Sequence, residues 1–292
     1  MPQGHIPKKI GRAPHVRSGA CGGPQIHKKQ EDRQRVSDMF EIKGKYNTAV
    51  VYADEIEASA RGQIQALCDQ RFAEGSTIRI MPDCHAGAGC TIGTTMTVTD
   101  KVVPNLVGVD IGCGMLCITL RGRAPIDFRR LDKVIRAQIP SGMNVRDKRH
   151  FKSEEIDLSA FACARHLKID HAYKSIGTLG GGNHFIEVSR SDGGACRLVI
   201  HSGSRHIGLE VADLYQKIAM KDRPGDVPPM LAYVQGQARE DYLHDMQICT
   251  RFARLNRETM AYEILRHMDL DEEAEFTTVH NYIDADAGLL RK

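Results

Sequence analysis

Short apolar runs between residues 48 and 200 constrain the fold most strongly, because each is bounded by Gly, Pro or Asp. Such runs predict β-strands. They do not alternate strictly with helical segments, so the sequence favours mixed or antiparallel sheets over a parallel β-α-β arrangement. We expect strands at residues 48–52, 77–80, 91–98, 102–109, 115–120, 185–188 and 197–200.

Helical periodicity occurs before, between and after these runs. One helix is predicted after residue 52, where Asp54 and Glu57 resemble a capping box. Further helices are predicted at residues 128–139 and 154–167 and over a long stretch after residue 229. The pattern indicates the α+β class. We expect a single domain with mixed or antiparallel β-sheets flanked by helices, covering residues 39–292.

Composition narrows the classes of protein that fit. The 292 residues are 41% hydrophobic, which is enough for a sizeable core. No run of 18 apolar residues occurs and the first thirty residues lack an apolar signal segment, so we expect no membrane partner and a cytoplasmic location. Nine cysteines without a Cys-x-x-Cys pair indicate reduced thiols rather than a disulfide framework. A net charge of +3 permits a nucleic-acid partner without requiring one.

Residues 1–38 differ from the rest, since their many cations stand among Gly, Pro and His with almost no apolar periodicity. We interpret them as a disordered basic N-terminal extension. Two explanations remain open for this extension. It is either sequence without function, added by an upstream start codon before Met39, or a tail that binds RNA.

Five side chains in glycine-, serine- or asparagine-rich turns form a candidate metal-binding set. Asp110 and Cys113 stand among glycines 108, 112 and 114, which let a ligand approach the main chain closely. His184, His201 and His280 supply three imidazoles. One thiolate can bridge two ions and leave open positions for phosphate oxygens, as two-metal phosphoryl-transfer sites require. Mixed O, N and S donors do not fix the identity of the metal.

Asp83 and His85 stand in another glycine-rich connection, at residues 81–93. Two residues apart in an extended segment, they would face the same way, so one could orient the other or a nearby ligand. A turn with polar residues on its surface explains the same pattern.

Two further connections suit an anion. Residues 177–187 hold four glycines ahead of Asn183 and His184, and such a loop can present backbone N–H groups to a phosphate. Arg205 follows two serines where a helix is predicted to begin. Its guanidinium could bind a phosphate, although a simple helix-capping turn would use the same serines.

Taken in chain order, five motifs carry a family resemblance: MPDCHAGAGCTIG, VGVDIGCGM, GTLGGGNHFIEV, HSGSR and HNY. Their order and context resemble the RtcB family of GTP-dependent RNA-splicing ligases, over about residues 39–292. The resemblance implies an enzyme that joins an RNA 3′-phosphate or 2′,3′-cyclic phosphate end to a 5′-hydroxyl end, in tRNA splicing or RNA repair. It allows an activating helper protein, and we favour a monomer.

The resemblance also implies cofactors and residue roles. The cofactors would be two Mn²⁺ ions and GTP. Asp110, Cys113 and His184 would hold one Mn²⁺, and Cys113, His201 and His280 the other. Arg205 would contact phosphate, and Asp83 and His85 would support catalysis. The guanylate site would be lined by Asn183, His184, Phe185, Ile186, Glu187, His280 and Asn281.

The chain departs from the family pattern in three places. The family's nucleophilic histidine lies in a Ser-His-Gly-Ala-Gly-Arg motif after the HNY element, and this motif is absent from the 292 residues. We therefore expect that the chain as given does not form the enzyme–GMP adduct. Ala88 stands where many members carry lysine, and His206 where many carry glycine, so the sequence leaves the preferred RNA substrate open.

Three functions remain open from the sequence alone. The first is an RNA ligase represented by an incomplete chain. The second is a protein that binds metal, nucleotide or RNA without ligation. The third is a metal-dependent phosphatase or phosphodiesterase, since two metal ions in an open site can activate water without a nucleophilic histidine.

Overall fold

The structure is a computed structural model that describes residues 39–87, 89–122 and 125–292. The predicted basic extension, residues 1–38, and Ala88 lie outside this part, so the predicted domain boundary stays a prediction. The described residues belong to one compact unit, Asp38–Lys292. Within these residues, no helix is both long enough and apolar enough to cross a bilayer.

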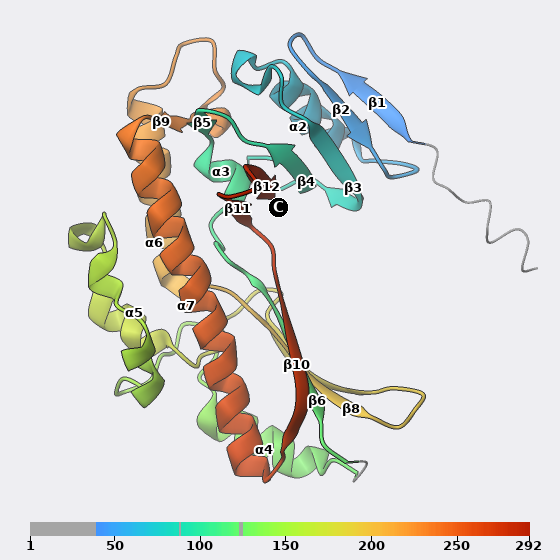
Figure 1. Ribbon diagram of the computed structural model, residues 1–292, viewed down its shortest axis with the longest axis vertical. Helices are drawn as coiled ribbons and strands as arrows, with labels where there is room; N and C mark the ends of the chain where they lie inside the picture. Colours follow the sequence, from blue (N-terminus) through green and yellow to red (C-terminus); the bar gives the residue numbers. More distant parts are fainter. Residues whose placement is uncertain (1–38, 88, 123–124) are drawn as a thin grey trace, which may run out of the picture. The chain divides into compact units, whose positions relative to one another are not determined.

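A mixed six-stranded sheet contains the first and the last strands of the described chain (Figure 1). Its order is β1-β2-β3-β4-β12-β11, and every neighbouring pair is antiparallel except β2 with β3. The strands are β1 (Phe40–Lys43), β2 (Thr48–Val51), β3 (Ile78–His85), β4 (Ile92–Thr97), β11 (Tyr282–Asp284) and β12 (Leu289–Arg291). The last two strands return the chain to this sheet from Tyr282, the last residue of the HNY motif.

A second, antiparallel sheet has the order β10-β6-β8-β7. One face of it packs on two helices, with Leu116, Leu198 and Ile200 fully buried against side chains such as Leu131 and Met260. Its strands are β6 (Gly114–Leu120), β7 (Phe185–Arg190), β8 (Cys196–Ser202) and β10 (Glu272–Val279), and the helices are α4 (Phe128–Gln138) and α7 (Gln237–Met268). A separate pair of short strands, β5 (Lys101–Val102) and β9 (Val234–Gln235), is also antiparallel.

Helix α7 is 32 residues long and packs against elements from several parts of the unit, namely α4, α6, β6 and β8 (Figure 1). Its buried residues occur on several faces, as expected for a helix enclosed by other elements. The other helices are α2 (Ala58–Cys68), α3 (Pro104–Val107), α5 (Ile169–Ser175) and α6 (Arg205–Lys221). Short 3₁₀ turns lie at Arg71–Ala73, Phe151–Glu155, Leu158–Ala160, Ala164–His166 and Pro229–Leu231.

The α+β class predicted from the sequence is confirmed, with helices and several sheets in one unit. The predicted strand at residues 102–109 is wrong, because only Val102 of that run lies in a strand and Pro104–Val107 is helical. Proline lacks a backbone N–H and has a helix-compatible φ, so it suits the first turn of a helix. Position 104 therefore begins a helix inside an apolar run.

The predicted helix at residues 154–167 is also wrong, since this stretch forms separate 3₁₀ turns. Asp157 accepts the N–H of Ser159 and so caps a local turn. The fully buried carboxylate of Asp245 accepts the N–H groups of Ala162 and Cys163 at 2.7 and 3.1 Å. Those two backbone donors are not available to a continuous helix, so a tertiary contact overrides the local periodicity.

The predicted capping box of Asp54 and Glu57 is not formed. Helix α2 begins at Ala58, and Glu57 occupies the N-cap position without a side-chain capping bond. Its Oε1 instead accepts the N–H of Ala86 at 2.6 Å, which ties α2 to the end of β3. The eight cysteines in the described part of the chain form no disulfide with one another.

Candidate metal centre

The loop between α3 and β6 carries Asp110 and Cys113. Gly108 ends α3 at a φ of 91°, a conformation that favours glycine. The N–H of Cys113 then donates to the backbone oxygen of Asp110 at 3.2 Å, which closes a turn. Gly112 lets this turn lie against α7, because a Cβ at position 112 would come within 2.6 Å of the Cα of Thr250. Both metal-binding side chains therefore project from one tight turn.

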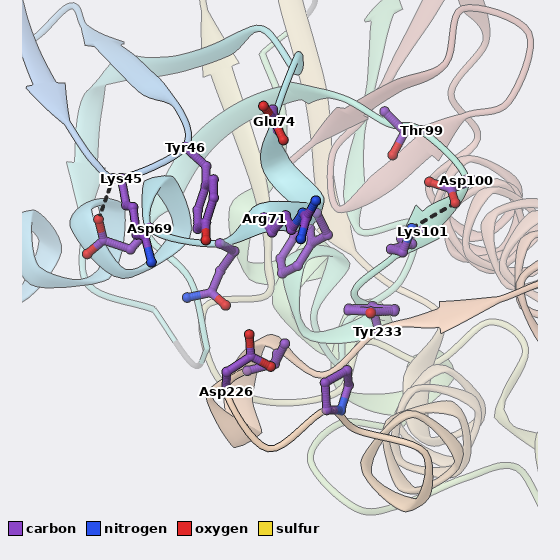
Figure 2. Close-up of a pocket in the computed structure, with 14 residues that line it drawn as sticks. Lys45, Tyr46, Asp69, Arg71, Glu74, Thr99, Asp100, Lys101, Asp226 and Tyr233 are labelled. Atoms are coloured by element: carbon purple, nitrogen blue, oxygen red, sulfur yellow. Dashed lines mark hydrogen bonds and ion pairs between the residues drawn. The ribbon is translucent and has the colours of Figure 1, made fainter.

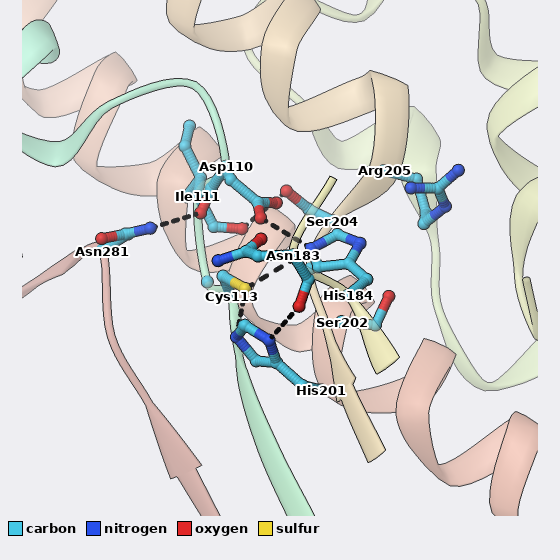
Figure 3. Close-up of polar contacts among 12 residues, drawn as sticks. Asp110, Ile111, Cys113, Asn183, His184, His201, Ser202, Ser204, Arg205 and Asn281 are labelled. Atoms are coloured by element: carbon cyan, nitrogen blue, oxygen red, sulfur yellow. Dashed lines mark hydrogen bonds and ion pairs between the residues drawn. The ribbon is translucent and has the colours of Figure 1, made fainter. Parts of the chain in front are cut away.

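The antiparallel sheet brings three histidines to this turn. His201 lies near the end of β8, opposite Met115 of β6. His184 directly precedes β7, which pairs with β8. His280 directly follows β10, and its N–H donates to the backbone oxygen of Cys113 at 2.8 Å. Figure 3 shows Cys113 beside the imidazoles of His184 and His201.

Cys113 lies at the middle of the cluster. Its Sγ is 3.6 Å from Nε2 of His184 and 3.3 Å from Nε2 of His201. Nε2 of His184 lies 2.9 Å from Oδ2 of Asp110, and Nε2 of His201 lies 3.4 Å from Nε2 of His280. These atoms form two groups with Cys113 in common, and within each group the donor atoms lie within 4.8 Å of one another. Each group could hold a metal ion.

Backbone carbonyls orient two of the imidazoles. The Nδ1 atom of His184 lies 3.0 Å from the oxygen of Leu179, and that of His201 lies 3.1 Å from the oxygen of Asn183. A carbonyl only accepts, so each Nδ1 carries a proton, and Nε2 is the atom of each ring that is left to bind a metal ion beside Cys113. Lone pairs and a carboxylate at such short range need a proton or a metal ion between them.

The surroundings of the cluster shift the pKa values of several of its side chains. Burial raises the pKa of the Cys113 thiol, and the nearby Asp110 carboxylate raises it further. Burial lowers the pKa of His201 and of His280. Burial opposes ionisation of Asp110, but its hydrogen bond with His184 holds the pKa of its carboxyl below the usual value. In the metal-free protein at neutral pH, the thiol is therefore protonated and the two imidazoles are neutral.

Asn256 of α7 holds two loops of the cluster together through hydrogen bonds. It was not among the residues predicted from the sequence. Its buried Oδ1 accepts the N–H groups of Gly177 and Thr178 at 2.8 and 3.0 Å. Its Nδ2 donates to the backbone oxygens of Thr178 and Gly203. One amide thus fixes the glycine-rich loop ahead of His184 relative to the turn after β8.

The next residue, Arg257, was also not among the residues predicted from the sequence. It is fully buried and its Nη1 donates to the backbone oxygens of Gly112 and Ser202 at 3.3 and 2.8 Å. These oxygens flank Cys113 and His201 in the sequence. Burial lowers the pKa of the Arg257 guanidinium to about 10, so it remains charged at neutral pH. An adjacent Asn-Arg pair inside a long amphipathic stretch is the only sequence signal for these two residues.

Arg205 begins α6, as predicted, and lies beside the cluster. Its Nε donates to Oγ1 of Thr178 at 3.1 Å and its Nη2 to the oxygen of Gly142 at 3.0 Å. A pocket of about 460 Å³ is lined by Arg205 together with Asp110 and His184. Its guanidinium is therefore held within the pocket that contains part of the cluster.

The residues predicted for a guanylate site do not all share one face. Phe185 is 36% exposed, Glu187 is exposed, and both lie on the face of β7 opposite to the helices. Ile186 packs against the core on the other face, so only its backbone could line a site there. Asn183 is exposed, and the Asn281 Nδ2 donates to the backbone oxygen of Asp110 at 3.3 Å.

Asp83 and His85 lie near the end of β3 and are exposed. Nδ1 of His85 is 3.0 Å from the backbone oxygen of Asp83, so the contact between them does not use the carboxylate. Neither residue belongs to the two groups that could hold a metal. The structure brings five of the predicted side chains together and leaves this pair outside that cluster.

A separate cavity of about 610 Å³ lies elsewhere in the unit (Figure 2). Its lining mixes cations such as Lys45 and Arg71 with anions such as Asp69 and Asp226, and Tyr233 forms part of its wall. None of its lining residues belongs to the two groups around Cys113. The chemistry indicated by the sequence is therefore not located in this cavity.

Comparison with known proteins agrees with the geometry. The family model described as tRNA-splicing ligase RtcB matches residues 63–167 and 159–287. The RNA-splicing ligase RtcB of Escherichia coli (strain K12) is 30% identical over 236 residues, which cover 72% of this chain and 57% of that protein. The tRNA-splicing ligase RtcB of Aeropyrum pernix is 25% identical over 314 residues, covering 80% and 64%. The chain thus spans little more than half the length of these curated relatives.

Proposed function

Because the chain belongs to the RtcB family, we propose that it provides the metal-binding part of an RNA ligase. The reaction would join a 3′-phosphate or 2′,3′-cyclic phosphate end to a 5′-hydroxyl end, with GTP as the nucleotide. The observation that carries the proposal is the position of Cys113, whose Sγ lies 3.6 and 3.3 Å from two carbonyl-oriented imidazoles. Relatives named RNA-splicing ligases support the choice of RNA as substrate.

Two Mn²⁺ ions are the metals we propose. Asp110, Cys113 and His184 would hold one ion, and Cys113, His201 and His280 would hold the other. The oriented Nε2 lone pairs and the short separations of the donor atoms fit this assignment. Donor chemistry alone does not separate Mn²⁺ from Zn²⁺, so the choice of Mn²⁺ rests on the family. When bound, the ions would neutralise charge on the phosphoryl group that reacts.

Side chains around the cluster would bind and orient the substrates. The Arg205 guanidinium, in the same pocket as Asp110, would bind a phosphate, because its planar donors match phosphate oxygens. The exposed ring of Phe185 lies with its centroid 5.3 Å from that of His201, where a nucleotide base could stack. Glu187 follows on the same strand face and could accept hydrogen bonds from guanine. We assign these residues, with Asn183 and Asn281, to GTP.

The 292 residues contain no Ser-His-Gly-Ala-Gly-Arg motif. We therefore propose that the chain binds GTP and RNA ends without becoming guanylylated. The same observation favours one alternative, a phosphodiesterase, because two metal ions can activate water without a histidine nucleophile.

The proposed function is tested with one set of reactions. The chain is incubated with Mn²⁺, α-labelled GTP and an RNA that carries a 2′,3′-cyclic phosphate and a 5′-hydroxyl. We expect Mn²⁺-dependent retention of GTP on a filter, no covalent label on the protein, and loss of GTP retention in Cys113→Ala. Hydrolysis of the cyclic phosphate that disappears in Cys113→Ala would establish the phosphodiesterase instead. Retention of GTP that does not depend on Mn²⁺ would contradict both functions.

A further inference from the structure

A strongly basic segment follows α4 and has no role in the function proposed above. Residues 146–152 read Arg-Asp-Lys-Arg-His-Phe-Lys, with four cations in seven positions and an aromatic residue between them. Basic side chains interleaved with aromatic ones are the composition expected of a surface for single-stranded nucleic acid. The structure determines which of these side chains face the protein and which face solvent.

Arg146 faces the protein and attaches the segment to the candidate metal centre. Its Nε donates to the backbone oxygen of Ile176 at 3.0 Å, and its Nη2 donates to the oxygens of Gln138 and Gly177 at 3.0 and 2.9 Å. Gly177 begins the glycine-rich loop that leads to His184. The basic segment is consequently fixed relative to a residue of the cluster around Cys113.

His150 attaches the same segment to α7. Its Nδ1 accepts the N–H of Lys152 at 3.2 Å, so the neutral ring carries its proton on Nε2. That Nε2 lies 3.0 Å from Oε1 of Glu263, and both side chains are more than nine-tenths buried. This buried contact fixes the backbone of the segment. Its outer side chains therefore stand on a pre-formed surface.

Cations and aromatic rings remain on the solvent side. Phe151 is 58% exposed, and its ring meets that of Tyr262 at a centroid distance of 5.4 Å. The cationic groups of Lys152 and Arg266 lie 5.7 and 6.0 Å from the centre of the Tyr262 ring. Lys148 is exposed and forms no ion pair within the described residues. The Nζ of Lys152 already pairs with Glu155 at 3.2 Å. A flexible strand of RNA would therefore place phosphates on the exposed Lys148 and Arg266 and a base against Phe151.

Two pockets lie along this segment. A pocket of about 600 Å³ is lined by Lys148, Phe151 and Arg266, among others. The pocket of about 460 Å³ that contains Asp110 and His184 is the second. Val145 lines both pockets, so the two pockets are neighbours along residues 142–151.

We propose that residues 145–152, together with Tyr262 and Arg266 of α7, form a docking surface for the single-stranded stretch of RNA next to the reacting end. The proposal rests on the function proposed above and assigns it a substrate-binding surface. An acidic peptide would also satisfy the cations, but the exposed Phe151 and the neighbouring pocket that contains Arg205 favour RNA.

The test measures the affinity of the full chain for a fluorescein-labelled 12-nucleotide RNA with a 3′-phosphate, by anisotropy over a series of salt concentrations. The double variant Lys148→Glu/Arg266→Glu should bind at least about ten-fold more weakly. A plot of the logarithm of the binding constant against the logarithm of the salt concentration has a negative slope. Loss of two phosphate contacts should make this slope shallower by about 1.4. Phe151→Ala should bind about five-fold or more weakly with an unchanged salt dependence, because it removes stacking and no charge.

The matched control is Lys217→Glu/Lys221→Glu on α6, which changes the net charge by the same amount at exposed positions outside both pockets. It should change the affinity by less than about two-fold, and all variants should bind Mn²⁺ as the unaltered chain does. Equal weakening in both double variants would overturn the surface assignment and leave the proposed function standing. Displacement of the RNA by hexaglutamate, with no effect of Phe151→Ala, would identify an acidic-peptide surface instead. Failure of the unaltered chain to bind RNA would remove RNA as the substrate and this surface with it.

Discussion

The buried guanidinium of Arg257 donates to the backbone oxygen of Ser202 at 2.8 Å, one residue after His201. The same nitrogen donates to the oxygen of Gly112 at 3.3 Å, one residue before Cys113. A single side chain of α7 therefore links the two segments whose donors meet at the centre of the cluster. Its Nε and Nη2 have no hydrogen-bond partner within the described residues, so its hydrogen bonding there is limited to those two contacts.

Arg257→Ala should lower the free energy of unfolding by about 3 kcal/mol or more, because it leaves two buried carbonyls unpaired and a cavity beneath the cluster. Arg251→Ala is the control, since Arg251 is an exposed residue of the same helix and should change the value by less than about 0.5 kcal/mol. Urea unfolding of the metal-free chains measures both values. Similar values for the two variants would show that Arg257 does not hold the loops.

Gly203→Ala should weaken metal binding at least about ten-fold. A Cβ at position 203 would overlap the carboxylate of Asp110, which must then move away from His184. Even a displacement of about 1 Å is expected to disrupt a ligand set held this closely. Isothermal titration with Mn²⁺ or Co²⁺ measures the change. Gly62→Ala is the matched control, because Gly62 is exposed in α2 with no atom near the added methyl group. That variant should keep the metal affinity and gain up to about 1 kcal/mol of stability.

Metal affinity should rise with pH between about pH 6.5 and 8, by close to ten-fold per pH unit. Burial raises the pKa of the Cys113 thiol, so the metal-free protein holds that proton throughout this range. Burial lowers the pKa of His201 and His280, so neither imidazole carries a competing proton there. An incoming ion must therefore displace one thiol proton. Titration in two buffers with different ionisation enthalpies counts the protons released, and an affinity independent of pH would show that the thiol is not a ligand.

Residue types and motif order are sufficient to predict the members of the cluster. Asp110 and Cys113 stand among glycines, and each histidine ends or begins an apolar run, so strand pairing alone can bring them together. The strand predicted at residues 185–188 already implies that Ile186 turns away from Phe185 and Glu187, although the family resemblance puts all three at the guanylate site. Strand alternation then determines the outcome.

The supporting residues could not be predicted, because their roles depend on where α7 crosses the loops. Asn256 and Arg257 have the local pattern of ordinary helix residues, and only the tertiary packing makes them buried hydrogen-bonding groups. Asp245 is a similar case, since its carboxylate captures the N–H groups of Ala162 and Cys163 from a distant segment. Long-range contacts of this kind have no periodic signal in the sequence.

The number of metal ions bound per chain tests the central claim most directly, because the claim is that Cys113 is shared by two sites. The chain is saturated with Mn²⁺ or Co²⁺, freed of excess ion and assayed by elemental analysis. We predict two ions per chain, at most one in Cys113→Ala, and two in Cys117→Ala, whose buried thiol belongs to neither group. A single ion in the unaltered chain, or two ions retained in Cys113→Ala, would contradict the account.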